Sequence, residues 1–234
     1  MANAYEQIRS ISLGKELIYE GIFNRFRELE PAIGKNYGMS NLNKLLVVAE
    51  SNYFEDDLET KSVFKDAEKW YHIENCLLIP EEKKNDVNSW IGEGYTIFNN
   101  LFKSMKTVLN ESNVEYEPYL LEEFAFYKNY FLRPASRKGG NLSFKKDCKQ
   151  IDRDVAGIAL CGIIDVIKPD ILIFTSKYAC EEFKMYCQNE NVVFDKLEIE
   201  FVYHPSRHFS WNHRKGLGKQ KFERLLREYW LKRK

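Results

Sequence analysis

Polar residues follow four apolar segments of the sequence, at positions where they could bind a small ligand. The apolar segments lie at about residues 44–49, 123–130, 170–174 and 198–203. The residues that follow them are Glu50 to Tyr53, Asn129 to Arg133, Thr175 to Lys177 and His204 to His208. Ligands of open α/β sheets bind beyond the carboxyl ends of the strands, so these clusters are the candidate site if the segments are strands.

Common phosphate, metal and cofactor signatures are missing from the sequence. Neither Gly-x-Gly-x-x-Gly nor Gly-x-x-x-x-Gly-Lys-Ser/Thr occurs, which argues against dinucleotide and Walker-type phosphate sites. Three histidines, His204, His208 and His213, lie close in sequence, but no carboxylate or cysteine completes a metal-ligand set. The five cysteines form no Cys-x-x-Cys pair. We therefore expect no metal and no other cofactor.

Helical patterns separate the apolar segments. Three-and-four spacing of apolar residues predicts helices at about 15–31, 62–73, 91–109, 178–188 and 222–231. Residues 152–167 are apolar on nearly all sides, which predicts a buried helix. Strands that alternate with helices favour an α/β fold, which we expect to have three layers, with a central, mostly parallel, four-stranded sheet between two layers of helices.

No repeat or low-complexity linker divides the chain, so we expect one domain over residues 1–234, with a helical extension at about 1–40. The N-terminal residues carry no apolar segment of the kind found in secretory signals. The longest apolar run, residues 156–164, is too short to cross a bilayer, which needs about 20 residues. These features and the odd number of cysteines predict a cytoplasmic protein with reduced thiols and no membrane partner.

The formal net charge is zero, but the charge is distributed unevenly. Residues 1–120 carry 13 Lys and Arg against 20 Asp and Glu, whereas residues 121–234 carry 22 against 15. Residues 204–234 include 10 Lys and Arg but only 2 Asp and Glu. Such an asymmetry can indicate a surface that meets a polyanion, but on this feature alone a basic terminal helix with a solvated face is the favoured interpretation.

Two of the clusters resemble motifs of the uracil-DNA glycosylase superfamily. The first motif of this family follows the first strand. It reads Gly-Gln-Asp-Pro-Tyr in one branch and Gly-Glu-Ala-Pro-Gly in the iron–sulfur branch. The corresponding residues of this chain are Ala49-Glu-Ser-Asn-Tyr53. The second motif begins His-Pro-Ser, as does His204-Pro205-Ser206. Between them the iron–sulfur branch has a strand that ends in Asn, then an Arg-Pro, as in Asn129 and Arg133-Pro134. The resemblance spans roughly residues 44–215 and implies the fold of that family.

The chain departs from the family pattern at several positions. Ser51 stands where other branches have the Asp or Asn that positions the attacking water, and where the active iron–sulfur branch has alanine. Ala49 and Asn52 replace the glycine and the proline of the first motif. The cysteines of the iron–sulfur cluster are absent, since no cysteine precedes Cys76.

The resemblance implies a division of labour in the cleavage of an N-glycosidic bond. His204 would donate a hydrogen bond to the departing base, on which negative charge develops. Asn129 would recognise the edge of the base, because an amide offers two donors and an acceptor. Glu50 would orient the water next to Ser51. Each residue also has a structural interpretation: Glu50 could cap a loop, Asn129 could form a turn, and His204 could be a packing residue.

The remaining site residues follow from the same resemblance. Tyr53 would exclude a methyl group from the base, and Phe64 would stack on it. Ser206 would bind a phosphate of the DNA. The basic residues Arg133, Arg207 and Lys215, together with Arg214, Lys219 and Lys221, would hold the DNA backbone along a ridge formed by residues 133–149 and 207–221.

The sequence thus predicts a DNA glycosylase that removes uracil or a related damaged base. The alternative is a non-catalytic member of the same fold that binds a nucleotide, a nucleic acid or a protein partner, and Ser51 and the neutral net charge favour this alternative. A hydrolase that uses Ser51 or Ser206 as nucleophile ranks last, because neither serine lies in a Gly-x-Ser-x-Gly motif.

Overall fold

A computed structural model describes residues 2–13, 22–39, 41–51, 53–54, 66–71, 96–136, 144–213 and 217–232. Phe64, Lys215 and Arg214 of the expected site lie outside these residues, as do parts of the helices expected at 15–31, 62–73 and 91–109. The side chain of Tyr53 is likewise not described.

The central sheet has five strands in the order β1-β4-β2-β6-β7. They are β1 (Ala32–Ile33), β2 (Leu45–Val48), β4 (Ala125–Tyr127), β6 (Ile171–Phe174) and β7 (Glu198–Phe201). Strands β4, β2, β6 and β7 run parallel to one another, and β1 pairs antiparallel with β4. The α/β class is therefore confirmed, and strands lie at all four expected segments, although β4 and β7 are shorter than expected.

The fifth strand, β1, was not predicted, and it makes the sheet mixed. Its two residues are too few to show an alternating pattern, and they fall in the region where we expected only helices. Backbone pairing of Ile33 with Ala125 places β1 at the edge beside β4. A separate two-stranded sheet joins β3 (Tyr53–Phe54) to β5 (Ala135–Ser136) in parallel.

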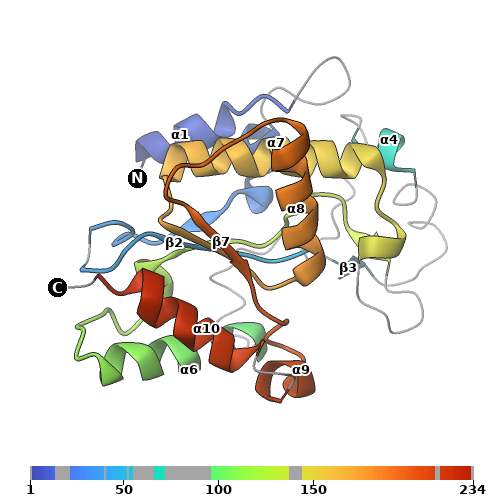
Figure 1. Ribbon diagram of the computed structural model, residues 1–234. Helices are drawn as coiled ribbons and strands as arrows, with labels where there is room; N and C mark the ends of the chain where they lie inside the picture. The colour runs from blue at the N-terminus through green and yellow to red at the C-terminus, as the bar shows by residue number, and fades with distance from the viewer. Residues whose placement is uncertain are drawn as a thin grey trace.

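Helices cover both faces of the central sheet (Figure 1). One face carries α1 (Ala2–Arg9), α2 (Ile22–Arg25), α4 (Ala67–Trp70), α7 (Gln150–Ile167) and α8 (Lys177–Asn189). The other carries α6 (Thr96–Glu111), α9 (His208–Asn212), α10 (Lys219–Leu225) and the π-helical η7 (Leu226–Trp230). Short 3-10 turns occur at η1 (Arg27–Leu29), η4 (Leu120–Glu123) and η6 (Phe144–Lys146).

Alternation along the strands explains the two cores. Leu46 and Val48 of β2 lie in the core beneath α7 and α8, whereas Leu45 and Val47 lie in the core that α6 and α10 cover. Successive side chains of a strand point to opposite faces, so a strand that is apolar throughout must be buried on both sides. The continuous apolar segment of β2 is thus the reason why the sheet needs two helical layers.

The N-terminal residues take part in the first of these cores. Ile8 of α1 and Phe23 of α2 are fully buried, and α1 packs along α7. The hydroxyl of Tyr5 accepts a hydrogen bond from the backbone N–H of Ile33 in β1, at 3.0 Å. Within the described part of the chain, no helix is both long and apolar enough to cross a membrane.

The order of the strands determines where a ligand can bind. From β2 the chain moves outward to β4, and it then returns past β2 to β6 and β7. The connections therefore leave β2 and β6 in opposite directions, which creates a crevice at the carboxyl ends of these two strands. Glu50 and Ser176 follow these ends directly.

Helices α7 and α8 pack closely at Gly157, and this contact can be tested. A Cβ at Gly157 would overlap the ring of Tyr186, whereas a Cβ at Gly162 would lie 2.8 Å from the flexible Cδ1 of Ile11. We expect Gly157→Ala to lower the free energy of unfolding by about 1–2 kcal/mol, because overpacking costs more than the roughly 1 kcal/mol of helix propensity gained. Urea denaturation should show a smaller change for the control, Gly162→Ala, and equal effects would contradict the close packing at Gly157.

Candidate functional site

Backbone hydrogen bonds bring the four strand exits to one edge of the sheet. The N–H of Ala49 donates to the carbonyl of Tyr127 at 2.9 Å, and the N–H of Thr175 donates to that of Val48 at 2.8 Å. The N–H of Val202 donates to Phe174 at 2.8 Å. Glu50, Asn129 and His204 therefore all follow strands at the same edge. Asn129 follows β4 and His204 follows β7, three strand positions away in the sheet. Because neighbouring strands lie about 4.8 Å apart, the carboxyl ends of β4 and β7 are roughly 14 Å apart.

Glu50 is buried and fully engaged by its neighbours. Its Oε1 accepts a hydrogen bond from the backbone N–H of Phe144 at 2.6 Å, and its Oε2 accepts one from the hydroxyl of Ser176. The carboxylate thereby ties the end of β2 to the start of α8 and to the segment before α7; we refer to these contacts as the Glu50 clamp. This geometry favours the structural interpretation of Glu50 over the orientation of a water molecule.

Ser176 is a residue of the site region that the sequence reasoning did not single out. Its hydroxyl accepts a hydrogen bond from the backbone N–H of Ala179 at 3.2 Å while it donates to Glu50. A serine immediately before a helical pattern is a typical N-cap, and this signal could have identified it. Its contact with a buried carboxylate from another strand could not be read from local sequence.

Asn129 and Ser51 are buried polar residues whose side chains have no hydrogen-bond partner in the described part of the chain. Asn129 is 0% exposed, and neither its Oδ1 nor its Nδ2 has a hydrogen-bond partner among the described residues. The hydroxyl of Ser51, which is 9% exposed, has no partner there either. A buried polar group without a hydrogen bond costs about 1–3 kcal/mol. Such unpaired groups are rare in folded proteins, so each needs an explanation.

His204 is held as a neutral imidazole with a defined tautomer. Its Nδ1 lies 3.3 Å from the backbone nitrogen of Ser206 and 2.7 Å from the hydroxyl of the same residue. Because the backbone N–H can only donate, Nδ1 accepts, and the proton of the neutral ring lies on Nε2. Burial, and to a smaller extent the positive charge of Arg207, lower the pKa of His204 to about 4.

The His-Pro-Ser segment is also fixed from the other side. The side-chain amide of Asn100 in α6 donates to the carbonyl of Pro205 at 2.6 Å. The backbone N–H of Arg207 donates to the carbonyl of His204 at 3.1 Å, which closes a tight turn. Ser206 itself is exposed, so its hydroxyl contacts both the ring of His204 and the surface.

Arg133 does not lie on a nucleic-acid surface as expected. Its guanidinium is 1% exposed and contacts both carboxylate oxygens of Asp152, from Nε at 2.8 Å and from Nη2 at 2.6 Å. Nη2 also donates to the carbonyl of Asp147, and the group lies 4.9 Å from the centre of the Phe144 ring. Arg133 is therefore a structural residue that joins the exit of β4 to the first turn of α7.

The expected basic ridge is smaller than the sequence indicated. Lys221 is buried and forms an ion pair of 2.5 Å with Glu200 of β7, so it does not present its charge to solvent. Lys219 pairs with Glu223 at 3.6 Å. Arg207 is exposed beside the His-Pro-Ser segment, as are Lys145 and Lys146 in η6. These exposed cations form the part of the ridge that the described residues support.

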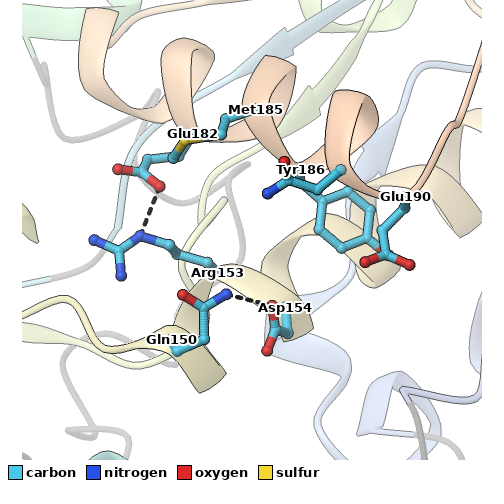
Figure 2. A pocket seen from close by; sticks show the side chains of 8 residues that line it. Gln150, Arg153, Asp154, Glu182, Met185, Tyr186 and Glu190 are labelled. Carbon is cyan, nitrogen blue, oxygen red and sulfur yellow. Dashed lines mark hydrogen bonds and ion pairs between the residues drawn. The ribbon is translucent and has the colours of Figure 1, made fainter.

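The described residues offer no metal site, and the cavity that they form between α7 and α8 is polar. No group of three or more His, Cys, Asp or Glu side chains that could hold a metal ion occurs among them. This cavity has a volume of about 220 Å³ and is lined mainly by polar residues, including Arg153, Glu182 and Tyr186 (Figure 2). None of the residues expected from the sequence to bind a base lines this cavity.

The buried Arg133–Asp152 pair should make a large contribution to stability. Removal of one partner leaves an uncompensated buried charge, so we expect Arg133→Met to lower the free energy of unfolding by about 3–5 kcal/mol. The double variant Arg133→Met/Asp152→Leu should recover much of this loss, because no unpaired charge remains. Urea denaturation of the three proteins measures both effects, and an Arg133→Met variant as stable as the wild type would contradict the pairing.

His204 should make stability depend on pH in a defined direction. Its pKa is near 6.5 when unfolded and about 4 in the native protein, so between these values the unfolded chain binds the proton more tightly. The native state is then destabilised as the pH falls from 6.5 to 4, by at most about 3 kcal/mol, and is unaffected above pH 7. Urea denaturation at pH 7 and 4.5 should show a smaller loss in His204→Gln than in the wild type. An imidazole NMR titration of His204 with a midpoint near 6.5 would refute this.

Comparisons with known proteins do not add to this picture. A scan against protein-family models and a search of curated protein sequences both gave no match to this chain. The geometry at the strand ends and the motifs of the sequence are therefore what indicates a function.

Proposed function

We propose that this protein binds a nucleobase at the carboxyl ends of its strands and hydrolyses the N-glycosidic bond of uracil or a related damaged base in DNA. The observation that carries the proposal is Asn129 beyond β4, a fully buried amide whose two polar atoms have no hydrogen-bond partner among the residues that the structure describes. The parallel strands β4, β2, β6 and β7, with the expected residues at their ends, support the resemblance to the uracil-DNA glycosylase fold.

An unpaired amide is suited to the edge of a base. Asn129 offers two donors and an acceptor, and a pyrimidine edge offers the complementary groups. Binding of such a base would satisfy the buried polar atoms that the free protein leaves without hydrogen bonds. A base that lacked these groups would leave them unpaired, and this penalty is the usual source of strong discrimination in polar sites.

His204 would stabilise the departing base. When the glycosidic bond breaks, the sugar becomes oxocarbenium-like and negative charge develops on the base. The Nε2–H of a neutral imidazole can donate a hydrogen bond to that charge, while Nδ1 is held by Ser206. The low pKa keeps the ring neutral at physiological pH, as a buried electrophilic histidine requires.

Water placement would differ from that in enzymes with an aspartate in the first motif. Both oxygens of Glu50 already accept hydrogen bonds within the Glu50 clamp. The hydroxyl of the adjacent Ser51, in contrast, has no hydrogen-bond partner among the described residues. Ser51 could hold a water by a hydrogen bond, but it brings no negative charge to the oxocarbenium-like sugar. We therefore expect slow hydrolysis that depends mainly on the stabilisation of the leaving base by His204.

DNA is the proposed partner. A base within a duplex must rotate out of the helix to reach a buried site, and the backbone must be held while it does so. The exposed Arg207 lies next to His204, and Lys145 and Lys146 lie on the segment before α7 that Glu50 anchors. Contacts with phosphates by such residues would make binding fall steeply with salt.

A binding protein without catalysis is the second candidate. It is favoured because both carboxylate oxygens of Glu50 already accept hydrogen bonds from the protein and Ser51 is uncharged. Among the described residues 49–51 and 53–54, directly after β2, no other carboxylate is present to activate a water. Such a protein would use Asn129 and His204 to recognise a base or nucleotide and would release it unchanged. The two candidates differ in one measurable property, which is the production of abasic sites.

Oligonucleotides that contain a single uracil, hypoxanthine or oxidised base test this proposal. We expect abasic sites with one of them, and His204→Ala should lower the rate by about 10²–10³, the usual effect of removing one such donor. The matched control His208→Ala removes an exposed imidazole four residues further on and should retain the rate.

Ser51→Asp should raise a weak activity, because it adds a carboxylate for the water. If the wild type and Ser51→Asp are inert but the protein binds a free base or nucleotide, the second candidate is correct; if nothing binds, both fail.

Asn129 should show a conflict between stability and function. Asn129→Leu replaces an unpaired buried amide with an apolar group of similar size, so we expect unchanged or higher stability, by up to about 1–3 kcal/mol, and loss of base binding. Ser104→Ala is the control: it removes another buried, unpaired hydroxyl, in α6, and should leave binding intact. Urea denaturation and a binding assay for both variants decide the matter, and a strongly destabilised Asn129→Leu would indicate that Asn129 is a structural residue.

A further inference from the structure

Two cysteines meet where α7 and α8 pack together. The thiol of Cys161 in α7 donates a hydrogen bond to the sulfur of Cys187 in α8. Both residues carry free thiols and are half-buried, so small reagents can approach them. Neither belongs to the candidate site at the strand ends, and the proposed function does not use them.

The packing of the two helices explains this contact. An ion pair of 2.7 Å joins Arg153 to Glu182, and one turn further along both helices Gly157 leaves room for the ring of Tyr186. Figure 2 shows the ion pair and the ring of Tyr186 between the two helices. The helices therefore run in the same direction, and residues four apart repeat on one face. Cys161 lies one turn beyond Gly157, and Cys187 follows Tyr186, so the close approach at Gly157 continues to the two sulfurs.

We propose that Cys161 and Cys187 are a redox-sensitive modification site, at which a low-molecular-weight disulfide converts the two thiols into a reversible disulfide between α7 and α8. In the first step Cys187, as a thiolate, attacks one sulfur of the small disulfide, and the other sulfur leaves as a thiolate. In the second step Cys161 loses its proton and attacks the mixed disulfide at Cys187, which releases the second small thiolate. In total, two protons and two electrons pass from the protein thiols to the small disulfide, which becomes two small thiols, so the exchange balances.

The environment assigns different roles to the two sulfurs. The hydrogen bond donated by Cys161 lowers the pKa of Cys187 and raises the pKa of Cys161. Since the thiolate is the nucleophile in thiol–disulfide exchange, Cys187 should attack first and Cys161 should resolve. The other described cysteines lack this arrangement: burial raises the pKa of both Cys148 and Cys180 to about 11.

The crosslink would strengthen the layer that carries the Glu50 clamp. Ser176, which donates to Glu50, caps the first turn of α8, and Asp152, which pairs with Arg133, lies in the first turn of α7. A disulfide stabilises mainly by constraining the unfolded chain, and the loop between residues 161 and 187 is long enough for a substantial effect. We expect the oxidised protein to unfold at a temperature roughly 5 °C or more above that of the reduced protein.

Glutathione disulfide is the probe for the test, with the full chain. After incubation and blocking of the remaining thiols, trypsin should release residues 154–177 joined to 185–196, because these peptides carry Cys161 and Cys187 separately from Cys180. Reductant should separate the two peptides and restore the lower unfolding temperature. No joined peptide, or a lasting glutathione adduct on Cys187 of the wild type, would overturn the proposal.

Single-site variants test the order of the two steps, and a check of their fold separates a chemical effect from misfolding. Cys161→Ser should trap glutathione on Cys187, because the resolving thiol is missing, whereas Cys187→Ser should react at least tenfold more slowly at Cys161. Cys148→Ser is the matched control and should form the disulfide as the wild type does. Circular dichroism of each reduced variant checks its fold, and equal rates of adduct formation at the two positions would contradict the assigned roles.

Discussion

The carboxylate of Glu50 is the interaction on which the arrangement of the strand ends depends. It is buried at the end of β2, where a charge without partners would be costly, and it is satisfied by the backbone of Phe144 and the hydroxyl of Ser176. These partners come from two different segments of the chain, so the segment before α7 and the start of α8 must both remain in place. The carbonyl of Glu50 also accepts from Phe131 at 2.8 Å, which positions the chain just after Asn129.

Buried polar groups in this protein divide into two kinds. Glu50, Arg133 and Asp152 have hydrogen-bond partners for their charged atoms and hold segments of the chain together. Asn129 and Ser51 lie beside them and have no partners among the described residues. The unpaired amide of Asn129 and hydroxyl of Ser51 each carry a cost in stability, which a ligand that supplied hydrogen-bond partners would remove. Such a cost is typical of sites that exist for a ligand.

The sequence was most informative where a pattern was local. Four apolar segments predicted the four parallel strands. The nearly all-apolar segment 152–167 predicted α7, and the helical pattern at 178–188 predicted α8, each to within two residues at each end. Strand β1 was missed because two residues carry no periodic signal, and its pairing with β4 depends on contacts distant in sequence. Arg133 was misassigned for a related reason: a basic residue in a basic loop looks exposed until Asp152, from the next helix, is placed beside it. For Asn129 and His204 the sequence indicated the strand exits but could not show that the amide is unpaired or that the imidazole is neutral.

The groups that we assign to the base and to the attacking water are all uncharged: the amide of Asn129, the hydroxyl of Ser51 and the imidazole of His204, whose pKa lies well below physiological pH. Uncharged donors bind a neutral base only modestly before reaction. As the glycosidic bond breaks, the base gains negative charge, and the hydrogen bond from Nε2 of His204 becomes stronger at that moment. Interactions that strengthen only in the transition state raise the rate rather than the affinity. A charged group in place of His204 would instead bind anionic compounds in the ground state, so a neutral, partly buried imidazole at this strand end suits the release of a base that is neutral before reaction better than the capture of an anion.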